Sequence, residues 1–112
     1  MTLTEEKKGK VFVLRLTGKI EVEGTKRFVQ RITEVLDGGE RYILLDFTDV
    51  AYIKSASVHA LVLVAKRLAS SSGKHVLAGV SDPIRKVFKI SGLTSFFTLQ
   101  PIKAEALDSF PQ

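Results

Sequence analysis

The chain of 112 residues contains no cysteine and no tryptophan, and it has only three prolines. Without cysteine there can be no disulfide, no thiolate metal site and no cysteine nucleophile. No apolar run approaches the roughly 18 residues that a membrane-spanning helix needs. The start of the chain is charged from Glu5 onward and lacks the apolar core of a signal peptide. These absences favour a cytoplasmic protein that does not insert into a membrane.

Residues that carry catalysis or bind metals are also scarce. The two histidines, His59 and His75, have no partner at the spacing of metal ligands. The sequence lacks the G-x-S-x-G turn of a hydrolase, and it lacks the glycine-rich loops that bind phosphates. Asp46 and Asp49 flank a strand end, where a structural role for Asp46 as acceptor of loop hydrogen bonds is favoured over a metal site. We therefore predict that the protein is not an enzyme and uses no metal and no cofactor.

Basic residues outnumber acidic ones by 17 to 12, which gives a formal net charge of +5. The basic residues are scattered along the chain and do not form an arginine-rich arm or alternate with stacking aromatic residues. This distribution is typical of polar helix faces, or of a surface that binds an acidic protein. Nucleic-acid binding is the less favoured alternative.

The rest of the sequence alternates between strand and helix patterns. We expect strands over 2–6, 11–17, 42–47, 75–80 and 96–99, a loop over 48–57, and helices over 22–36, 56–70, 83–91 and 104–110, the third with Asp82 as its N-cap. Such alternation builds a mostly parallel sheet through right-handed crossovers, with an antiparallel edge supplied by the first hairpin. We therefore predict one α/β domain over residues 1–112, with a mixed, mostly parallel sheet of four to five strands and about four helices.

The most informative segment is 45–58, in which a buried strand runs into a turn and small polar residues open a helix. Taken alone, Ser55 is typical of a helix N-cap, a role that contributes about 1 kcal/mol. The segment resembles the STAS domain signature, strand–D-[LF]-[ST]-x-V-x-[FY]-[IM]-D-S-S-G-[LV]. The residues in register with that signature are Asp46, Phe47, Thr48, Val50, Tyr52, Ile53, Ser55 and Val58.

Two further segments support the resemblance. Gly18-Lys19-Ile20-Glu21 is similar to the strand-ending G-x-[IL]-[DE] of the family. Residues 82–88, followed by Ser91-Gly92-Leu93, are similar to its third-helix pattern, which ends in [ST]-G-L. Together the matches span about residues 11–99, in the order and spacing of the family.

The resemblance implies a STAS domain of the anti-sigma factor antagonist type. Such a protein binds an anti-sigma factor that has serine kinase activity, and binding frees a sigma factor to act in transcription. In this family the kinase phosphorylates the first serine of D-S-S-G, which abolishes the binding, and Ser55 stands at that position. The partner-binding surface implied by the resemblance consists of Gly18, Glu21, Tyr52, Ile53, Lys54, Ser55, Ala56, Ser57, Val58 and His59.

Three residues depart from the signature, since Lys54, Ala56 and Ser57 replace its aspartate, second serine and glycine. Lys54 can pair with a phosphate on Ser55 or change what a kinase recognises, so a phosphorylation-switched binder and a constitutive binder both stay open. One alternative keeps the fold without a serine switch, as a scaffold in a stress-signalling complex or an accessory subunit of a lipid transporter. A basic nucleic-acid-binding protein is the third hypothesis.

Overall fold

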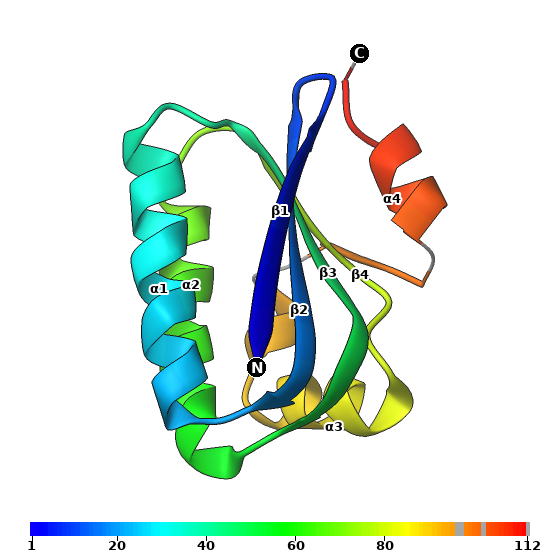
Figure 1. Ribbon diagram of the computed structural model, residues 1–112. Helices are drawn as coiled ribbons and strands as arrows, with labels where there is room; N and C mark the ends of the chain where they lie inside the picture. The colour runs from blue at the N-terminus through cyan, green and yellow to red at the C-terminus, as the bar shows by residue number, and fades with distance from the viewer. Residues whose placement is uncertain (96–97, 102, 112) are drawn as a thin grey trace.

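The structure is a computed structural model that describes residues 1–95, 98–101 and 103–111. The strands are β1 (Thr2–Lys8), β2 (Val11–Ile20), β3 (Tyr42–Ile53), β4 (Lys74–Ala78) and β5 (Thr98–Gln100). The α-helices are α1 (Val22–Asp37), α2 (Val58–Ala69), α3 (Asp82–Ile90) and α4 (Lys103–Asp108), and two 3-10 turns are η1 (Ser55–Ser57) and η2 (Leu93–Ser95). The order of these elements is shown in Figure 1.

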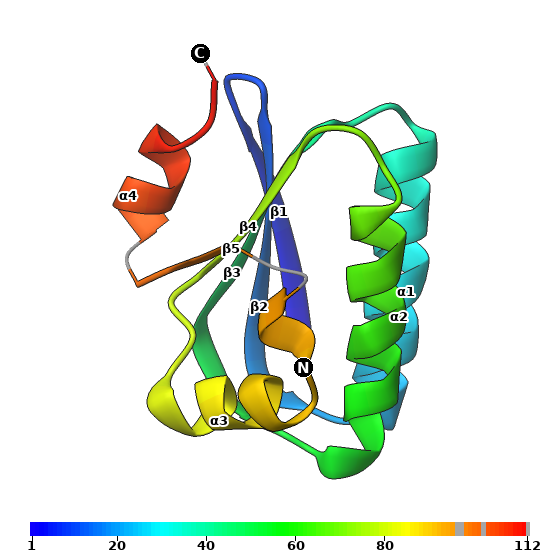
Figure 2. The same cartoon turned by 180° about the vertical axis from the view of Figure 1, so that it is seen from behind.

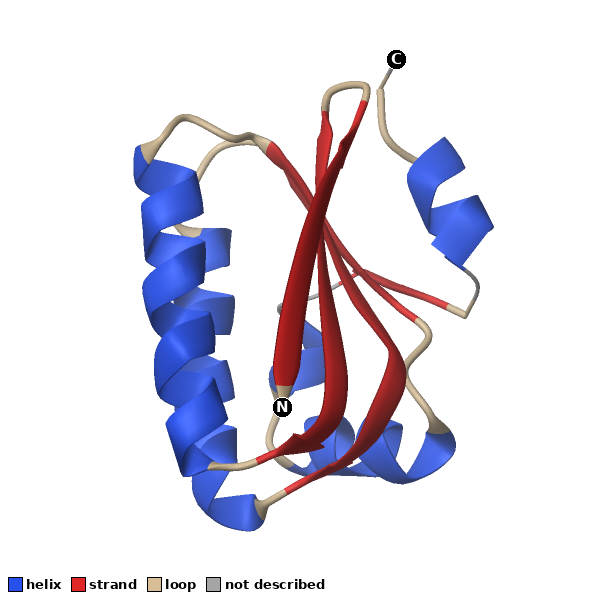
Figure 3. Cartoon of the chain, viewed as in Figure 1, coloured by secondary structure: helices blue, strands red, loops and turns tan. Residues whose placement is uncertain are grey.

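The strands form one sheet in the order β1-β2-β3-β4-β5. β1 pairs antiparallel with β2, and all the other neighbours are parallel, which confirms the predicted α/β fold with a mixed, mostly parallel sheet (Figure 3). Because parallel strands end at the same edge, β2, β3 and β4 deliver the starts of α1, η1 and α3 to one end of the molecule. This carboxyl edge is where the segment around Ser55 lies.

Helices cover the two faces of the sheet unequally. On one face α1 and α2 pack side by side over the main core, to which they contribute Phe28, Ile32, Leu61 and Leu68 (Figure 1). The short helix α4 covers part of the opposite face, where Ala106 and Phe110 join a second, smaller core (Figure 2). α3 lies across the carboxyl edge of the sheet, and its buried side chains close the main core from below.

Several expected boundaries are wrong. The predicted loop at 48–57 is mostly strand, because β3 continues to pair with β2 through Gly18↔Val50 and Ile20↔Ile53 after an irregularity in the register. The helix expected from Ala56 begins as the 3-10 turn η1 and becomes α-helical only at Val58. The N-cap of α3 is Ser81, one residue before the expected Asp82. Part of the expected last strand, at 96–97, lies outside the described residues.

Candidate functional site

The backbone around Ser55 is held by the sheet. After the last β2–β3 pair, the Lys54 amide donates a hydrogen bond to the Ile20 carbonyl oxygen at 2.9 Å, so the strand ladder reaches the start of the turn. Lys54 itself is extended, and the Ser57 amide then donates to the Lys54 carbonyl oxygen at 2.8 Å, which begins η1. Ser55 therefore directly follows the last residue whose backbone is hydrogen-bonded to β2.

The Ser55 side chain is exposed, and within the described residues its hydroxyl forms no hydrogen bond. The N-cap role is therefore wrong for Ser55, because Lys54 and Ser57 occupy the cap positions of η1 and α2 and neither forms a side-chain cap bond. A hydroxyl that faces solvent and forms no hydrogen bond within the described residues is accessible to a partner or to a modifying enzyme.

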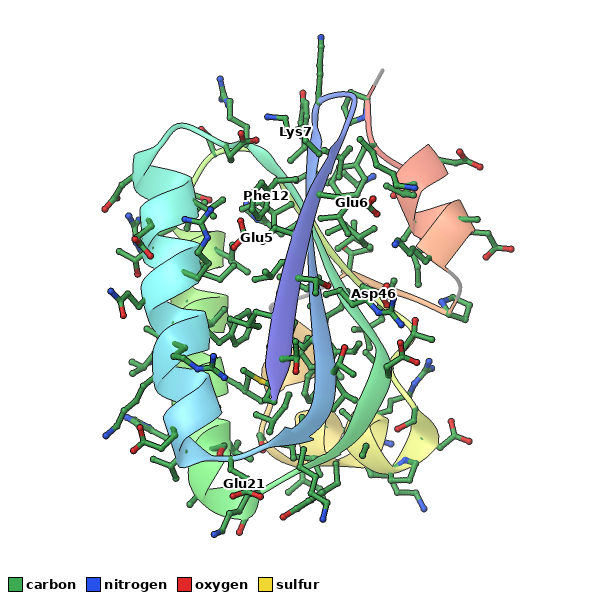
Figure 4. All side chains as sticks on the ribbon, in the orientation of Figure 1. Glu5, Glu6, Lys7, Phe12, Glu21 and Asp46 are labelled. Atoms are coloured by element: carbon green, nitrogen blue, oxygen red, sulfur yellow. The ribbon has the colours of Figure 1, made fainter. Side chains whose placement is uncertain are left out.

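Most of the expected partner-binding residues reach the surface around Ser55. Lys54, Ala56 and His59 are exposed, and Val58 is half-buried. Gly18, near the end of β2, is half-buried, and Glu21, in the connection between β2 and α1, is exposed. Figure 4 labels Glu21 at the same end of the molecule.

Tyr52 is the large apolar side chain of this surface, with 42% of its area exposed. It pairs with Lys19 across the β2–β3 ladder, and the Lys19 ammonium lies 5.9 Å from the centre of the Tyr52 ring. Lys19 fills the variable position of G-x-[IL]-[DE], so the motif does not single it out. Only the strand register brings it to Tyr52. Lys19 and Glu21 also line a shallow hollow of about 380 Å³ beside Met1 and Arg27.

Two of the residues predicted to contact a partner, Ile53 and Ser57, are buried, so this part of the prediction is wrong. Ile53 is 7% exposed and belongs to the main core, because alternation along β3 turns its side chain inward. Ser57 is 1% exposed, at the point where η1 lies against α1, and its hydroxyl has no hydrogen-bond partner within the described residues. Ile53 and Ser57 thus support the surface from beneath and cannot touch a partner on it.

Asp46 accepts two hydrogen bonds inside the fold, which confirms the predicted structural role. One of its carboxylate oxygens accepts from the Thr48 amide at 3.0 Å and from the Thr48 hydroxyl at 2.6 Å. Lys103 Nζ lies 3.7 Å from the other oxygen, and the nearby Asp49 pairs with Arg15. Within the described ranges, no group of three or more His, Asp and Glu side chains is arranged to hold a metal ion. Both aspartates have structural partners.

None of the helices in the described ranges is long and apolar enough to cross a membrane. The architecture agrees with the family expectation, and a model of the STAS domain matches residues 3–106. The chain belongs to the STAS domain family.

A relative from Bordetella bronchiseptica, BtrV, carries the name of an anti-sigma factor antagonist. It is 31% identical over 110 residues, a match that covers 98% of this chain and 95% of BtrV. Among solved structures, one of a Thermotoga maritima protein titled as an anti-sigma factor antagonist superimposes with a TM-score of 0.86 at 21% identity, covering 98% of this chain and 95% of that one. The Bacillus protein SpoIIAA, solved in its phosphorylated form, gives a TM-score of 0.73 at 23% identity, with 96% and 97% covered. These structures share the fold of this chain.

Proposed function

We propose that this protein is an anti-sigma factor antagonist, which regulates transcription in the cytoplasm by binding an anti-sigma factor with serine kinase activity. The observation that carries the proposal is the exposed, unbonded Ser55 hydroxyl at the junction of β3 and η1. It stands in a chain that aligns over nearly its whole length with a relative named as such an antagonist. The protein acts by binding and not by catalysis.

The contact surface consists of Gly18, Lys19, Glu21, Tyr52, Lys54, Ser55, Ala56, Val58 and His59. Half-exposed aromatic side chains are frequent anchors of protein interfaces, and Tyr52 has this character. Small side chains at Gly18, Ser55 and Ala56 let a partner approach the backbone closely. The surface therefore combines an aromatic anchor with a flat, polar centre.

Ser55 is proposed as the phosphoacceptor that regulates binding. A phosphate adds about −1.5 to −2 charges, and in the middle of an interface this charge must be desolvated and repels acidic groups of the partner. Lys54 is exposed beside Ser55 and offsets part of that charge. Phosphorylation is thus expected to weaken binding less than it would if residue 54 were the aspartate of the family signature.

The test is isothermal titration of the purified chain with kinase-type anti-sigma factors encoded in the same genome. Ser55→Asp should weaken binding at least about tenfold, because the added negative charge has to be desolvated in the interface and repels acidic groups of the partner. Ser55→Ala should bind as the wild type does. Ser72→Asp is the matched control, since this exposed serine contacts Arg41 at the opposite end of the molecule. Equal affinities for Ser55→Asp and Ser55→Ala would exclude this surface.

Lys54 also supports the alternative of a STAS scaffold or accessory subunit without a serine switch, because its charge alters the site that a kinase would recognise. Co-expression with the kinase-type anti-sigma factor, followed by intact-mass analysis, separates a phosphorylation-switched antagonist from a STAS protein without a serine switch. One added phosphate that disappears in Ser55→Ala supports the switch. Tight binding with no added phosphate supports a constitutive interaction with the anti-sigma factor, and the absence of both binding and phosphate supports the scaffold or accessory subunit.

A further inference from the structure

The outer face of α3 carries an unpaired cluster of positive charge. Arg85, Lys86 and Lys89 are all exposed, and none of them has an ion-pair partner within the described residues. Asp82, at the start of the helix, is the one acidic residue of α3. By contrast, Arg31 and Arg67, on α1 and α2, are each neutralised by a carboxylate.

An almost fully exposed isoleucine lies at the end of the same helix. Ile90 is 87% exposed, the highest value among the exposed large hydrophobic side chains of the described residues. Its apolar neighbours Ile84 and Phe88 are buried on the opposite side of α3. Ile90 therefore has no part in the core, and it stands beside the basic side chains of the same helix.

α3 is fixed against the sheet at the end of the molecule that also carries the Ser55 surface. Phe88 packs edge-on against Phe47 of β3, with 5.9 Å between the ring centres, which fixes α3 against the sheet. β3 and β4 are neighbours, and their carboxyl ends lead to η1 and α3 respectively. In both Figure 1 and Figure 2, α3 and the start of η1 lie at the same end of the molecule.

We propose that the outer face of α3 is a second contact for the protein partner that binds the Ser55 surface. It would engage an acidic patch of that partner through Arg85, Lys86 and Lys89, while Ile90 fills an apolar depression within the patch. The inference rests on the proposed function and adds the chemistry of the partner. Complementary charge accelerates encounter and sets orientation, and one buried aliphatic side chain slows dissociation.

The side chains on the outer face of α3 favour an acidic protein as the partner over a nucleic acid or an anionic membrane. A nucleic acid would gain little from Ile90, because phosphate contacts use no aliphatic group. Binding to an anionic membrane needs a broad apolar face, and α3 offers a single exposed isoleucine. An acidic protein surface uses both kinds of side chain.

The experiment measures association and dissociation rates of the kinase-type anti-sigma factor for three variants of α3 and one control. The double variant Lys86→Glu/Lys89→Glu should slow association about tenfold or more at low salt, with less effect at high salt. Ile90→Ser should speed dissociation about fivefold to tenfold, and the triple variant should combine the two effects. Lys66→Glu is the matched control, because Lys66 is exposed near the far end of α2 and has no ion-pair partner in the described part of the chain.

The outcomes separate this inference from the proposed function. If the wild type binds, Ser55→Asp weakens binding and the α3 variants match Lys66→Glu, the α3 contact is wrong and the proposed function stands. If the wild type binds no kinase-type anti-sigma factor, both are wrong. Duplex DNA and phosphatidylglycerol vesicles are added as probes at low salt. Binding of either that depends on Lys86 and Lys89, while anti-sigma factor rates stay unchanged, would also overturn the inference.

Discussion

His75 is a half-buried residue near the start of β4. Its Nε2 lies 3.1 Å from the Ser71 hydroxyl oxygen, at the turn that precedes the strand. Burial lowers the pKa of His75 below its ordinary value of 6.5, because the charged ring loses solvation. The folded protein therefore favours the neutral imidazole.

A pH dependence of stability follows from this shift. Between the lowered pKa of folded His75 and the ordinary value of 6.5, the unfolded chain binds more protons than the folded one. The stabilising effect is thus fully present above about pH 6.5 and is lost as the pH falls below it. His75→Gln should have a flatter decline in its free energy of unfolding between about pH 7 and 5, measured by urea denaturation.

The matched control for His75 is the exposed His59. His59→Gln should follow the wild-type pH profile of stability. If His75→Gln keeps the wild-type slope as well, the burial of the ring does not govern the acid sensitivity of this fold.

At the scale of elements, the end of β4 approaches β3 very closely. Gly79 has φ +73°, and an added Cβ would lie 2.9 Å from the Thr48 amide nitrogen and the Thr48 Cα. A side chain there has to tolerate both a left-handed backbone and a steric overlap with main-chain atoms. The close approach lets β4 turn into α3 beside the end of β3.

Gly79→Ala should therefore destabilise the protein by more than about 2 kcal/mol, since the overlap adds to the cost of the left-handed conformation. Gly9→Ala is the control, because Gly9 has φ +60° with no atom within 4 Å of an added Cβ. It should lose only about 1 kcal/mol. Thermal and urea unfolding measure both variants, and equal losses would show that the contact with Thr48 is unimportant.

The types and order of the elements were predictable from the sequence because their apolar periods are strong. The helix stripe of Phe28, Ile32 and Val35 and the run of 42–47 lie where they were expected. The extension of β3 to Ile53 was not predictable, because polar Thr48 and Asp49 interrupt the apolar pattern and only pairing with β2 continues the strand.

The candidate site was predictable in position but not in orientation. The family signature places Ser55 after a strand and before a helix, and the structure agrees. The signature does not tell which side chains of the segment face inward, so it includes the buried Ile53 and Ser57. Lys19 and the charged face of α3 depend on tertiary neighbours, which the sequence motifs do not encode.

At the scale of the whole molecule, the two cores lie on opposite faces of the sheet. The smaller core depends on Phe110, which is 3% exposed and stacks edge-on with Tyr42, their ring centres 6.1 Å apart. Lys74 Nζ donates a hydrogen bond to the Ser109 carbonyl oxygen at 2.5 Å, and Lys103 pairs with Glu6 of β1 at 3.3 Å. These contacts hold α4 and the following Ser109 and Phe110 against the sheet, far from Ser55.

Phe110→Ala should separate stability from function. Removing the ring should lower the free energy of unfolding by about 3 kcal/mol, because it leaves a cavity under α4. The affinity for the anti-sigma factor should stay within about twofold of the wild type, since η1 and α3 are supported by the main core. Phe88→Ala, which removes the packing of α3 on Phe47, should lower both quantities. Equal loss of affinity in the two variants would contradict this division.

The hydrogen bond from the Lys54 amide to the Ile20 carbonyl oxygen has a consequence for the thermodynamics of association. A recognition segment on a free loop would lose about 1–2 kcal/mol of backbone entropy for each residue that becomes ordered on binding. Here that loss has already occurred during folding, because the sheet fixes the backbone that leads into Ser55. A partner therefore meets a preformed surface, and a small number of contacts is enough for tight binding.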